Sequence, residues 1–169
     1  MSKNDFDAYL KAISTSPDRL TRQTVKTAGK LAEKLAGRAR EGAPVQDGQL
    51  RESLKAYTTR EGDVIEGGVH STLPHAIYQE MGTGPVGDAN PHPLENELHP
   101  ARTAEGWTYQ SAEVAAQRGE AYVKDEKGGY VYTEGVPARG YLYNAINSME
   151  GEIDRELGAC LSMEVILDE

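Results

Sequence analysis

The feature that most constrains this fold is a long helical pattern near the N-terminus. From Ser16 onward, apolar and small side chains recur every three or four residues, the spacing that places them on one face of an α-helix: Leu20, Thr24, Ala28, Leu31, Leu35 and Ala39. Ser16 and Pro17 are typical of an N-cap and a first helical position, so we expect the helix to start there, after a separate short helix over residues 5–13. Gly42 is typical of a residue that ends a helix.

The opposite face of this helix is basic. Its cationic side chains lie about four residues apart, and we call them the basic ridge: Arg19, Arg22, Lys26, Lys30, Lys34 and Arg38. The rest of the chain is acidic, since residues 86–169 carry 6 basic and 16 acidic side chains within a total net charge of −9. A basic ridge of this kind fits a solvated helix face, or a docking surface for an acidic partner such as the acidic half of a neighbouring copy. Binding of nucleic acid through the ridge is a third interpretation, which the acidic remainder disfavours because it repels phosphate.

The middle of the chain predicts a hairpin followed by a loop. Apolar and polar residues alternate from Leu54 to His70 around a turn at residues 60–63, which is typical of two antiparallel strands. Residues 73–81 then favour one or two helical turns. From Pro85 to about Ala101 the sequence is rich in Pro, Asn and His without periodicity, so we expect a long loop.

The last third predicts short strands and a second helix. The segments "GWTYQ" and "GGYVYTEG" have β character, and residues 111–129 between them predict a flexible excursion with marginal helix. Residues 140–161 predict a single helix, and residues 162–169 an edge strand. The apolar stripe of that helix consists of Leu142, Ile146, Met149, Ile153, Leu157 and Leu161.

These elements predict a single α+β domain over residues 1–169. We expect a small antiparallel sheet packed against the long N-terminal helix and the C-terminal helix, with a flexible loop insertion at about 85–129. Cys160 is the only cysteine, so no internal disulfide can form, and its apolar surroundings favour a core position. No apolar run approaches the roughly 20 residues that span a bilayer.

The sequence "GTGPVG" at Gly82–Gly87 has the spelling of a dinucleotide-binding turn. Such a turn works between a buried strand and a helix whose N-terminus faces the pyrophosphate. The residues before it favour a helix, and we expect the prolines that follow to prevent a helix from starting. The pattern therefore predicts a bend rather than a phosphate site.

The four histidines do not have the spacing of a metal site, and we expect them to be exposed on loops: His70, His75, His92 and His99. No nucleophile has a base and an acid at a recognisable spacing, so the sequence predicts no enzyme, no catalytic residue and no cofactor. The alternative that stays open is a small cytoplasmic nucleotide- or metal-binding enzyme that uses the glycine turn 82–87 and the loop histidines. A soluble DNA-binding factor that uses the basic helix is a further alternative.

Three stretches together resemble a known family. They are "APVQDGQLRESL" (Ala43–Leu54), "PHAIYQEMGTG" (Pro74–Gly84) and "GVPARGYLYNAI" (Gly135–Ile146), which we call the first, second and third motifs. Their order and spacing resemble the small neck and tail-completion proteins of long-tailed bacteriophages, also described as minor tail components. The resemblance covers about residues 17 to 160.

The resemblance is carried by individual positions in each motif. The matching residues are Ala43, Pro44, Val45, Gly48, Leu50, Arg51 and Ser53 in the first, Tyr78, Glu80, Gly82 and Thr83 in the second, and Pro137, Ala138, Arg139, Leu142 and Ala145 in the third. The chain departs from the family pattern at Gln46 and Asp47, at Met81 in place of an aromatic, and at Gly140, Tyr141 and Asn144.

The resemblance implies a structural component of the virion at the head–tail junction, made in the host cytoplasm. It implies a homo-oligomeric ring whose partners are other neck proteins, namely the head connector or stopper and the tail terminator or tail tube. It implies no membrane and no sequence-specific binding of nucleic acid, although an acidic ring would suit a channel through which DNA slides. The motif residues proposed for assembly are Arg51, Tyr78, Glu80, Gly82, Thr83, Trp107, Pro137 and Arg139.

Some side chains in this set carry hypotheses of their own. Arg51 and Glu80 are expected to form an ion pair that fixes the hairpin to the glycine bend. Arg139, near the start of the C-terminal helix, is expected to have an acidic partner because its charge opposes the helix dipole. The loop from about Pro85 to Gln117, with Trp107, is the predicted contact with a neighbouring neck protein.

Overall fold

The computed structural model describes residues 3–45, 48–98, 105–109, 122–123 and 130–161. The chain forms two compact units. The helix–hairpin unit comprises Met1–Gly42, Arg51–Ser71 and Tyr143–Glu169, and the motif unit comprises Ala43–Leu50 and Thr72–Leu142. No single cut in the sequence separates these units. The α+β class is confirmed, and the single-domain organisation stays a prediction.

The helix–hairpin unit is built on one long helix, α1 (Lys3–Gly42). The predicted break before Pro17 is wrong, since α1 continues through that residue. A proline in a helix interior removes one backbone hydrogen bond and costs about 3 kcal/mol, and here the turns on both sides continue the helix across it. At about 1.5 Å per residue, a helix of 40 residues is roughly 60 Å long.

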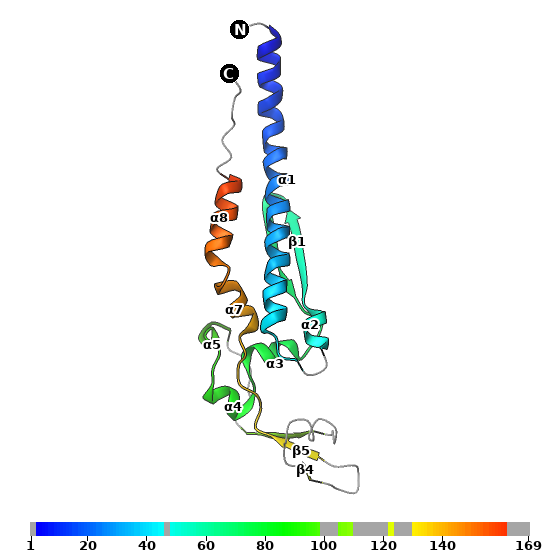
Figure 1. The fold of residues 1–169 in the computed structure, drawn as a ribbon, viewed down its shortest axis with the longest axis vertical. Coiled ribbons are helices and arrows are strands. Elements are labelled where there is room, and N and C mark those ends of the chain that lie inside the picture. Colours follow the sequence, from blue (N-terminus) through cyan, green and yellow to red (C-terminus); the bar gives the residue numbers. More distant parts are fainter. Residues whose placement is uncertain (1–2, 46–47, 99–104, 110–121, 124–129, 162–169) are drawn as a thin grey trace. The chain divides into compact units, whose positions relative to one another are not determined.

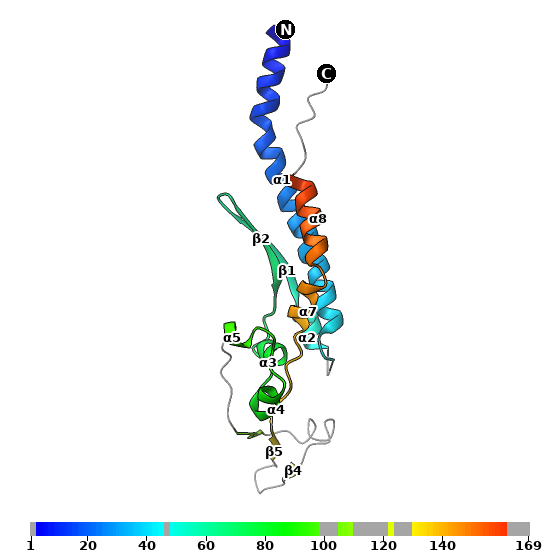
Figure 2. The same cartoon turned by 90° about the vertical axis from the view of Figure 1, so that its left-hand side faces the viewer.

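Among the α1 side chains whose exposure is described, residues 19–42, the buried ones begin at Leu31. Leu31 and Ala39 of the predicted stripe are buried, while Leu20 is 38% exposed. Ala32 and Ala36 are buried as well, although they lie outside the stripe. The buried face is broader than one stripe because α1 lies between the hairpin and the C-terminal helix α8 (Glu150–Leu161) (Figures 1 and 2).

The hairpin is confirmed, and it packs closely on α1. Strands β1 (Lys55–Glu61) and β2 (Val64–His70) pair antiparallel around a two-residue turn, whose Gly62 has φ +59°. A Cβ on Gly67 would lie 3.1 Å from the backbone oxygen of Ala28, so a glycine at this point lets the strand approach the helix.

The predicted C-terminal helix is interrupted. It consists of α7 (Tyr141–Asn147) and α8, with a turn at Ser148 and Met149 between them. The hydroxyl of Ser148 donates to the backbone oxygen of Ala145 at 2.7 Å, a local bond that competes with the helical pattern. Met149 is fully buried at the turn, whereas Ile146 of the predicted stripe is 48% exposed, so that stripe is wrong at Ile146.

The core position of Cys160 is confirmed. Its side chain is buried, and its Sγ lies 3.5 Å from the Oγ1 of Thr24 on α1, where α8 packs against that helix. The short helix α2 (Gln49–Ser53) leads from the end of α1 into β1 and buries Leu50.

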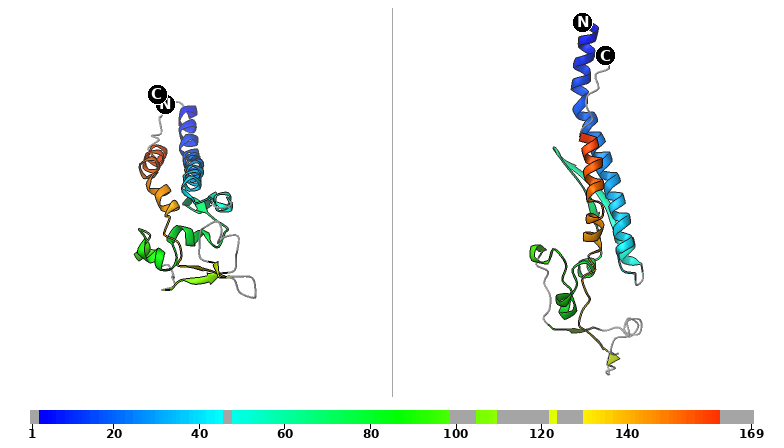
Figure 3. Two further views of the ribbon diagram at one scale, coloured as in Figure 1. Left: turned by 60° about the horizontal axis from the view of Figure 1, so that its bottom comes forward. Right: turned by 60° about the vertical axis from the view of Figure 1, so that its left-hand side comes forward.

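The motif unit contains short helices and a small sheet (Figure 3). Its helices are α3 (Ala76–Met81), α4 (Gly84–Ala89) and α5 (Glu95–Leu98). The long loop predicted from Pro85 is therefore wrong, because Pro85 occupies the first turn of α4, where a missing N–H has little cost. The helical turns predicted at residues 73–81 are confirmed by α3.

The sheet of the motif unit has the strand order β3 (Trp107–Tyr109), β5 (Tyr130–Thr133), β4 (Tyr122–Val123). Both predicted β segments are confirmed by β3 and β5. The marginal helix predicted for residues 111–129 is wrong at β4, and the rest of that segment lies outside the described residues, as does the edge strand predicted at 162–169. None of the helices in the described ranges combines the length and apolar character needed to cross a bilayer.

Candidate assembly interface

The second and third motifs meet in the motif unit, although more than fifty residues separate them in the sequence. The backbone N–H of Thr83 donates to the oxygen of Val136 at 2.9 Å, and the N–H of Arg139 donates to the oxygen of Gln79 at 3.0 Å. A third bond runs from the N–H of Gly140 to the oxygen of Glu80 at 3.1 Å. We call this set of backbone bonds the motif seam.

Gly82 and Gly135 make the motif seam possible. Gly82 has φ +78°, and a Cβ there would lie 2.6 Å from the backbone nitrogen of Ala138. Gly135 has φ +98°, and a Cβ there would collide with the carbonyl oxygen of Thr83. Both positions require positive φ and a close backbone approach, which only glycine provides without strain. Gly82 of the "GTGPVG" stretch therefore serves the contact between two motifs.

Glu80 is the polar centre of this site. It is 6% exposed, and its Oε2 accepts the backbone N–H of Leu142 at 2.9 Å in the first turn of α7. A carboxylate at this point satisfies an otherwise unpaired helix N–H and complements the positive end of the helix dipole. Its Oε1 lies 3.1 Å from the Nε2 of His92.

The protonation of His92 follows from its two neighbours. The backbone N–H of Leu94 donates to its Nδ1 at 3.1 Å, so Nδ1 is the acceptor nitrogen of a neutral ring. The Nε2 then carries the proton and donates to Glu80. His92 is 3% exposed, and the prediction that it is an exposed loop histidine is wrong, because the loop folds over Glu80. His70 and His75 are exposed as predicted, and His99 lies outside the described residues.

Tyr141 closes the site from the third motif. Its ring is 2% exposed, and its hydroxyl donates to the backbone oxygen of Ala76 at 3.1 Å. Burial, together with the nearby charge of Glu80, raises the pKa of Tyr141 to about 12. A buried aromatic with its hydroxyl satisfied helps to fix α3 against the start of α7.

The aromatic residues proposed for assembly differ in exposure. Tyr78 is 53% exposed on α3, next to Ile77, which is also 53% exposed. Trp107 is 37% exposed, and a Cβ on Gly84 would lie 3.0 Å from its indole, so this ring packs over α4 while keeping part of its surface in solvent.

The remaining motif residues have mixed positions. Pro137 is half-buried in the motif seam, and Arg139 is exposed. Arg51 on α2 donates to the backbone oxygen of Glu41 at 3.4 Å within the helix–hairpin unit. Glu80 belongs to the motif unit, so the ion pair between Arg51 and Glu80 stays a prediction, as does an acidic partner for Arg139.

The basic ridge does not form one straight row in the structure. Each four-residue step turns about 40° beyond a full helical turn, so the ridge winds around α1. Lys34 and Arg38 reach α8, where both bind the carboxylate of Glu152, Arg38 at 3.1 Å. Arg38 also donates to the Oγ of Ser148 at 2.9 Å. The hydrogen bond from Lys34 is the main cause that holds the pKa of Glu152 below its usual value.

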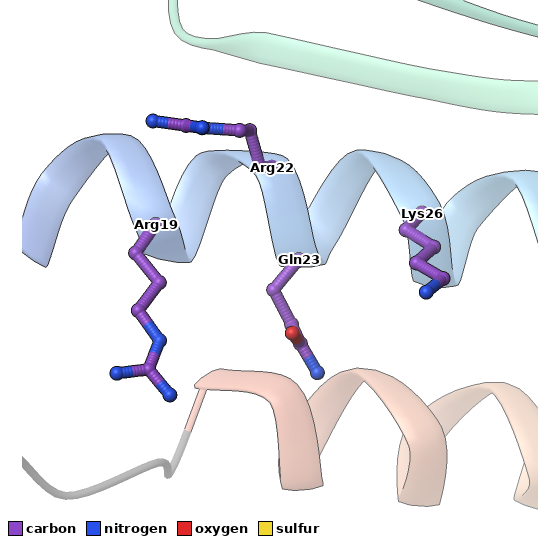
Figure 4. Close-up of a pocket in the computed structure, with 4 residues that line it drawn as sticks. All are labelled: Arg19, Arg22, Gln23 and Lys26. Atoms are coloured by element: carbon purple, nitrogen blue, oxygen red, sulfur yellow. The ribbon is translucent and has the colours of Figure 1, made fainter.

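The N-terminal part of the ridge lies at the surface. Figure 4 shows Arg22 on the side of α1 toward the hairpin, whereas Arg19 and Gln23 extend toward α8. Together with Lys26 these side chains line a shallow basic depression on α1. Lys30 is exposed farther along the helix.

The geometry bears on the enzyme alternative at two points. The glycine turn follows helix α3 and not a buried strand, although α4 does start at Gly84, contrary to the expectation that no helix would follow. Within the described residues, no group of three or more His, Cys, Asp or Glu side chains is placed to hold a metal ion.

Sequence reasoning identified the second and third motifs but missed two features of their contact. Nothing in the spacing of His92 and Glu80 indicates a pair. The turn at Ser148, where Arg38 binds, could not be predicted either, because the apolar residues around it recur at helical spacing and indicate an unbroken helix.

The described residues form a long helix, a hairpin on that helix and two motifs held together by a backbone seam, an α+β arrangement. Residues 4–82, which run from α1 to the end of α3, match the family described as "Bacteriophage HK97-gp10, putative tail-component". This part of the chain is similar to that HK97-gp10-like family, which confirms the resemblance inferred from the motifs. The match supports a bacteriophage tail component, a structural protein of the virion.

The match ends at Gly82, so the third motif lies outside it and is connected to it by the motif seam. No curated protein matches the chain, and no solved structure matches it either.

Proposed function

We propose that this tail component joins the phage head to the tail as a ring of identical subunits in the virion neck. The family supports a structural role in the tail. The observation that carries the ring is the presence of two complementary charged surfaces on the helix–hairpin unit. A head-to-tail contact between such surfaces generates a closed ring when the rotation between subunits closes.

The two surfaces lie on α1 and α8. The basic surface consists of the exposed ridge residues Arg19, Lys26 and Lys30. The acidic surface consists of the exposed α8 residues Glu150 and Asp154, which lie one helical turn apart. Lys34 and Arg38 already bind Glu152 within one chain, which shows that the ridge is suited to carboxylates of α8. Between copies, the same chemistry would guide subunits into register.

Charge reversal in two matched variants tests this contact. One variant replaces Lys26 and Lys30 with Glu, and the other replaces Glu150 and Asp154 with Lys. Neither is expected to assemble alone, because each presents like charges to its own copies, whereas an equal mixture is expected to form alternating rings. Sedimentation velocity measures the outcome. Equal assembly of each variant alone, or no assembly of the mixture under conditions where the wild type assembles, contradicts the proposal.

An acidic channel for DNA is part of the same proposal. Residues 86–169 hold 16 of the 27 acidic side chains of the chain, and an acidic lumen would keep DNA from adhering to the ring. Amidation of exposed acids outside α8, Glu105→Gln together with Glu134→Gln, is expected to slow DNA ejection from assembled virions. Unchanged ejection kinetics in virions that contain the variant would contradict a role of these acids at the channel.

A further inference from the structure

The hairpin of the helix–hairpin unit has two open edges. Strands β1 and β2 pair with each other only, in a two-stranded sheet. Helix α1 contacts both strands, so it covers a face of the hairpin and not one of its edges. Thr58 on β1 and Gly67 on β2 both face α1, which identifies the covered face. Each strand has seven residues, which gives edges of roughly 23 Å.

The register shows which backbone groups point outward. A two-residue turn makes Glu61 and Val64 the first hydrogen-bonded pair, and bonded and non-bonded pairs alternate from there. The residues of the non-bonded pairs direct their N–H and C=O groups away from the hairpin. They are Ala56, Thr58 and Arg60 on β1, and Ile65, Gly67 and Val69 on β2. Within the part of the chain that the structure describes, no other backbone group binds them.

These edges lack a proline and a bulge, two of the usual features that block pairing. Proteins protect an edge strand with a proline, a bulge or inward-pointing charge. Both strands are described in full, and they contain no proline and pair without a bulge from Lys55 to Glu61. The middle of β1, "AYTT", is uncharged and has high β propensity.

The hairpin is also weakly supported within one chain. No residue of β1 or β2 is buried, and every one is either half-buried or exposed. A two-stranded hairpin is marginally stable, and further strands or a covering helix are needed for independent stability. Here α1 covers one face, and additional strands at the edges would supply the remaining support.

We propose that β1 of one copy pairs with β2 of the next, so that the hairpins form a continuous antiparallel sheet around the ring. This inference rests on the proposed ring and names the surface that closes it. Because β1 and β2 of one hairpin are antiparallel, the same head-to-tail step repeats with antiparallel pairing at every interface. Closure leaves no unpaired edge, which is how closed sheets avoid uncontrolled pairing. A second copy fits because it offers the complementary edge with the same length and, like the first, without a proline or a bulge.

Site-directed cross-linking between copies tests this pairing. The native Cys160 is replaced with Ala, and single cysteines are introduced as Thr59→Cys on β1 and Glu66→Cys on β2. Both positions are exposed on the face of the hairpin opposite α1, so the changes do not disturb its packing. The two full-length variants are mixed and treated with a short bis-maleimide, which tolerates a small shift in register. Circular dichroism checks that each variant folds like the wild type.

The proposal predicts that the mixture gives cross-linked dimers containing one chain of each variant, well above the share from random pairing. Each variant alone is expected to lose this product. Cross-links between two Thr59→Cys chains, or between two Glu66→Cys chains, indicate a two-fold contact and overturn the proposal, and so does the absence of any cross-link. Rings seen by electron microscopy without mixed cross-links would refute the hairpin contact while leaving the neck ring intact. The absence of rings would refute the proposed function itself.

Discussion

Replacement of Glu80 by alanine is expected to destabilise the motif unit. Glu80 accepts two hydrogen bonds, one from Leu142 at 2.9 Å and one from His92 at 3.1 Å. Alanine leaves both donors without their carboxylate partner in a buried site. An unsatisfied buried donor costs about 1–3 kcal/mol, so for two donors we expect a loss of roughly 2–6 kcal/mol in the free energy of unfolding.

The Glu80→Gln variant separates hydrogen bonding from packing. The amide oxygen can still accept from Leu142, but its NH₂ group then faces the N–H of His92. His92 cannot exchange its tautomer to accept, because its Nδ1 already accepts from Leu94. We therefore expect Gln to cost about 1–2 kcal/mol, less than alanine and more than zero.

Urea unfolding followed by tryptophan fluorescence measures this loss. Trp107 is the only tryptophan of the chain and belongs to the motif unit, so its signal reports on that unit. Glu97→Gln removes an exposed carboxylate from the same unit and is expected to change stability by less than about 0.5 kcal/mol. Equal stability of Glu80→Ala and Glu97→Gln would refute the assignment of Glu80 as the polar centre of the site.

Three further perturbations test the packing around this site and along α1. Gly82→Ala is expected to lower the free energy of unfolding by about 1–3 kcal/mol, because φ is +78° and the new Cβ meets the third motif. Gly151→Ala on α8 meets nothing and is expected to raise the free energy of unfolding by about 0.5–1 kcal/mol. Thermal unfolding compares the two variants. Tyr141 has a folded pKa raised from 10.0 to about 12, so its contribution to folding stability is complete below pH 10 and is lost as the pH rises toward 12. Tyr141→Phe is expected to weaken this alkaline fall in stability. An unchanged dependence of stability on alkaline pH would contradict the prediction. Glu152 has a folded pKa below its ordinary value of 4.5, so its contribution to folding stability is present above that pH and is lost as the pH falls through the folded pKa. Glu152→Gln is expected to reduce this loss of stability in acid. An equal effect of Glu156→Gln, which removes an exposed carboxylate, would count against the prediction.

The elements with strong local signals were predictable from the sequence. The hairpin follows from alternation and a glycine turn, and α3 follows from a short helical run. The break at Pro17 was predicted wrongly because an N-cap residue before a proline is a common start signal, yet one lost hydrogen bond does not end a helix whose neighbouring turns form. The same preference for the first helical turn explains why Pro85 starts α4 where a loop was expected.

The candidate site was only partly predictable. The motifs identified Glu80, Gly82 and Thr83, but their meeting with the third motif depends on tertiary contacts across more than fifty residues. His92 had no signal because its role comes from the folding of a loop over Glu80. The residues of the basic ridge were predicted correctly as a series. Which of them bind α8 and which face solvent depends on how the ridge winds around α1.

Restoration of head–tail joining by the purified protein tests the central claim most directly. Heads and tails are prepared from phage that lack this protein, mixed with it and counted by electron microscopy. The account predicts separate heads and tails without the protein, and joined particles with a ring of density at the junction once the protein is added. Heads and tails that join equally well without it, or that stay separate in its presence, would contradict the account.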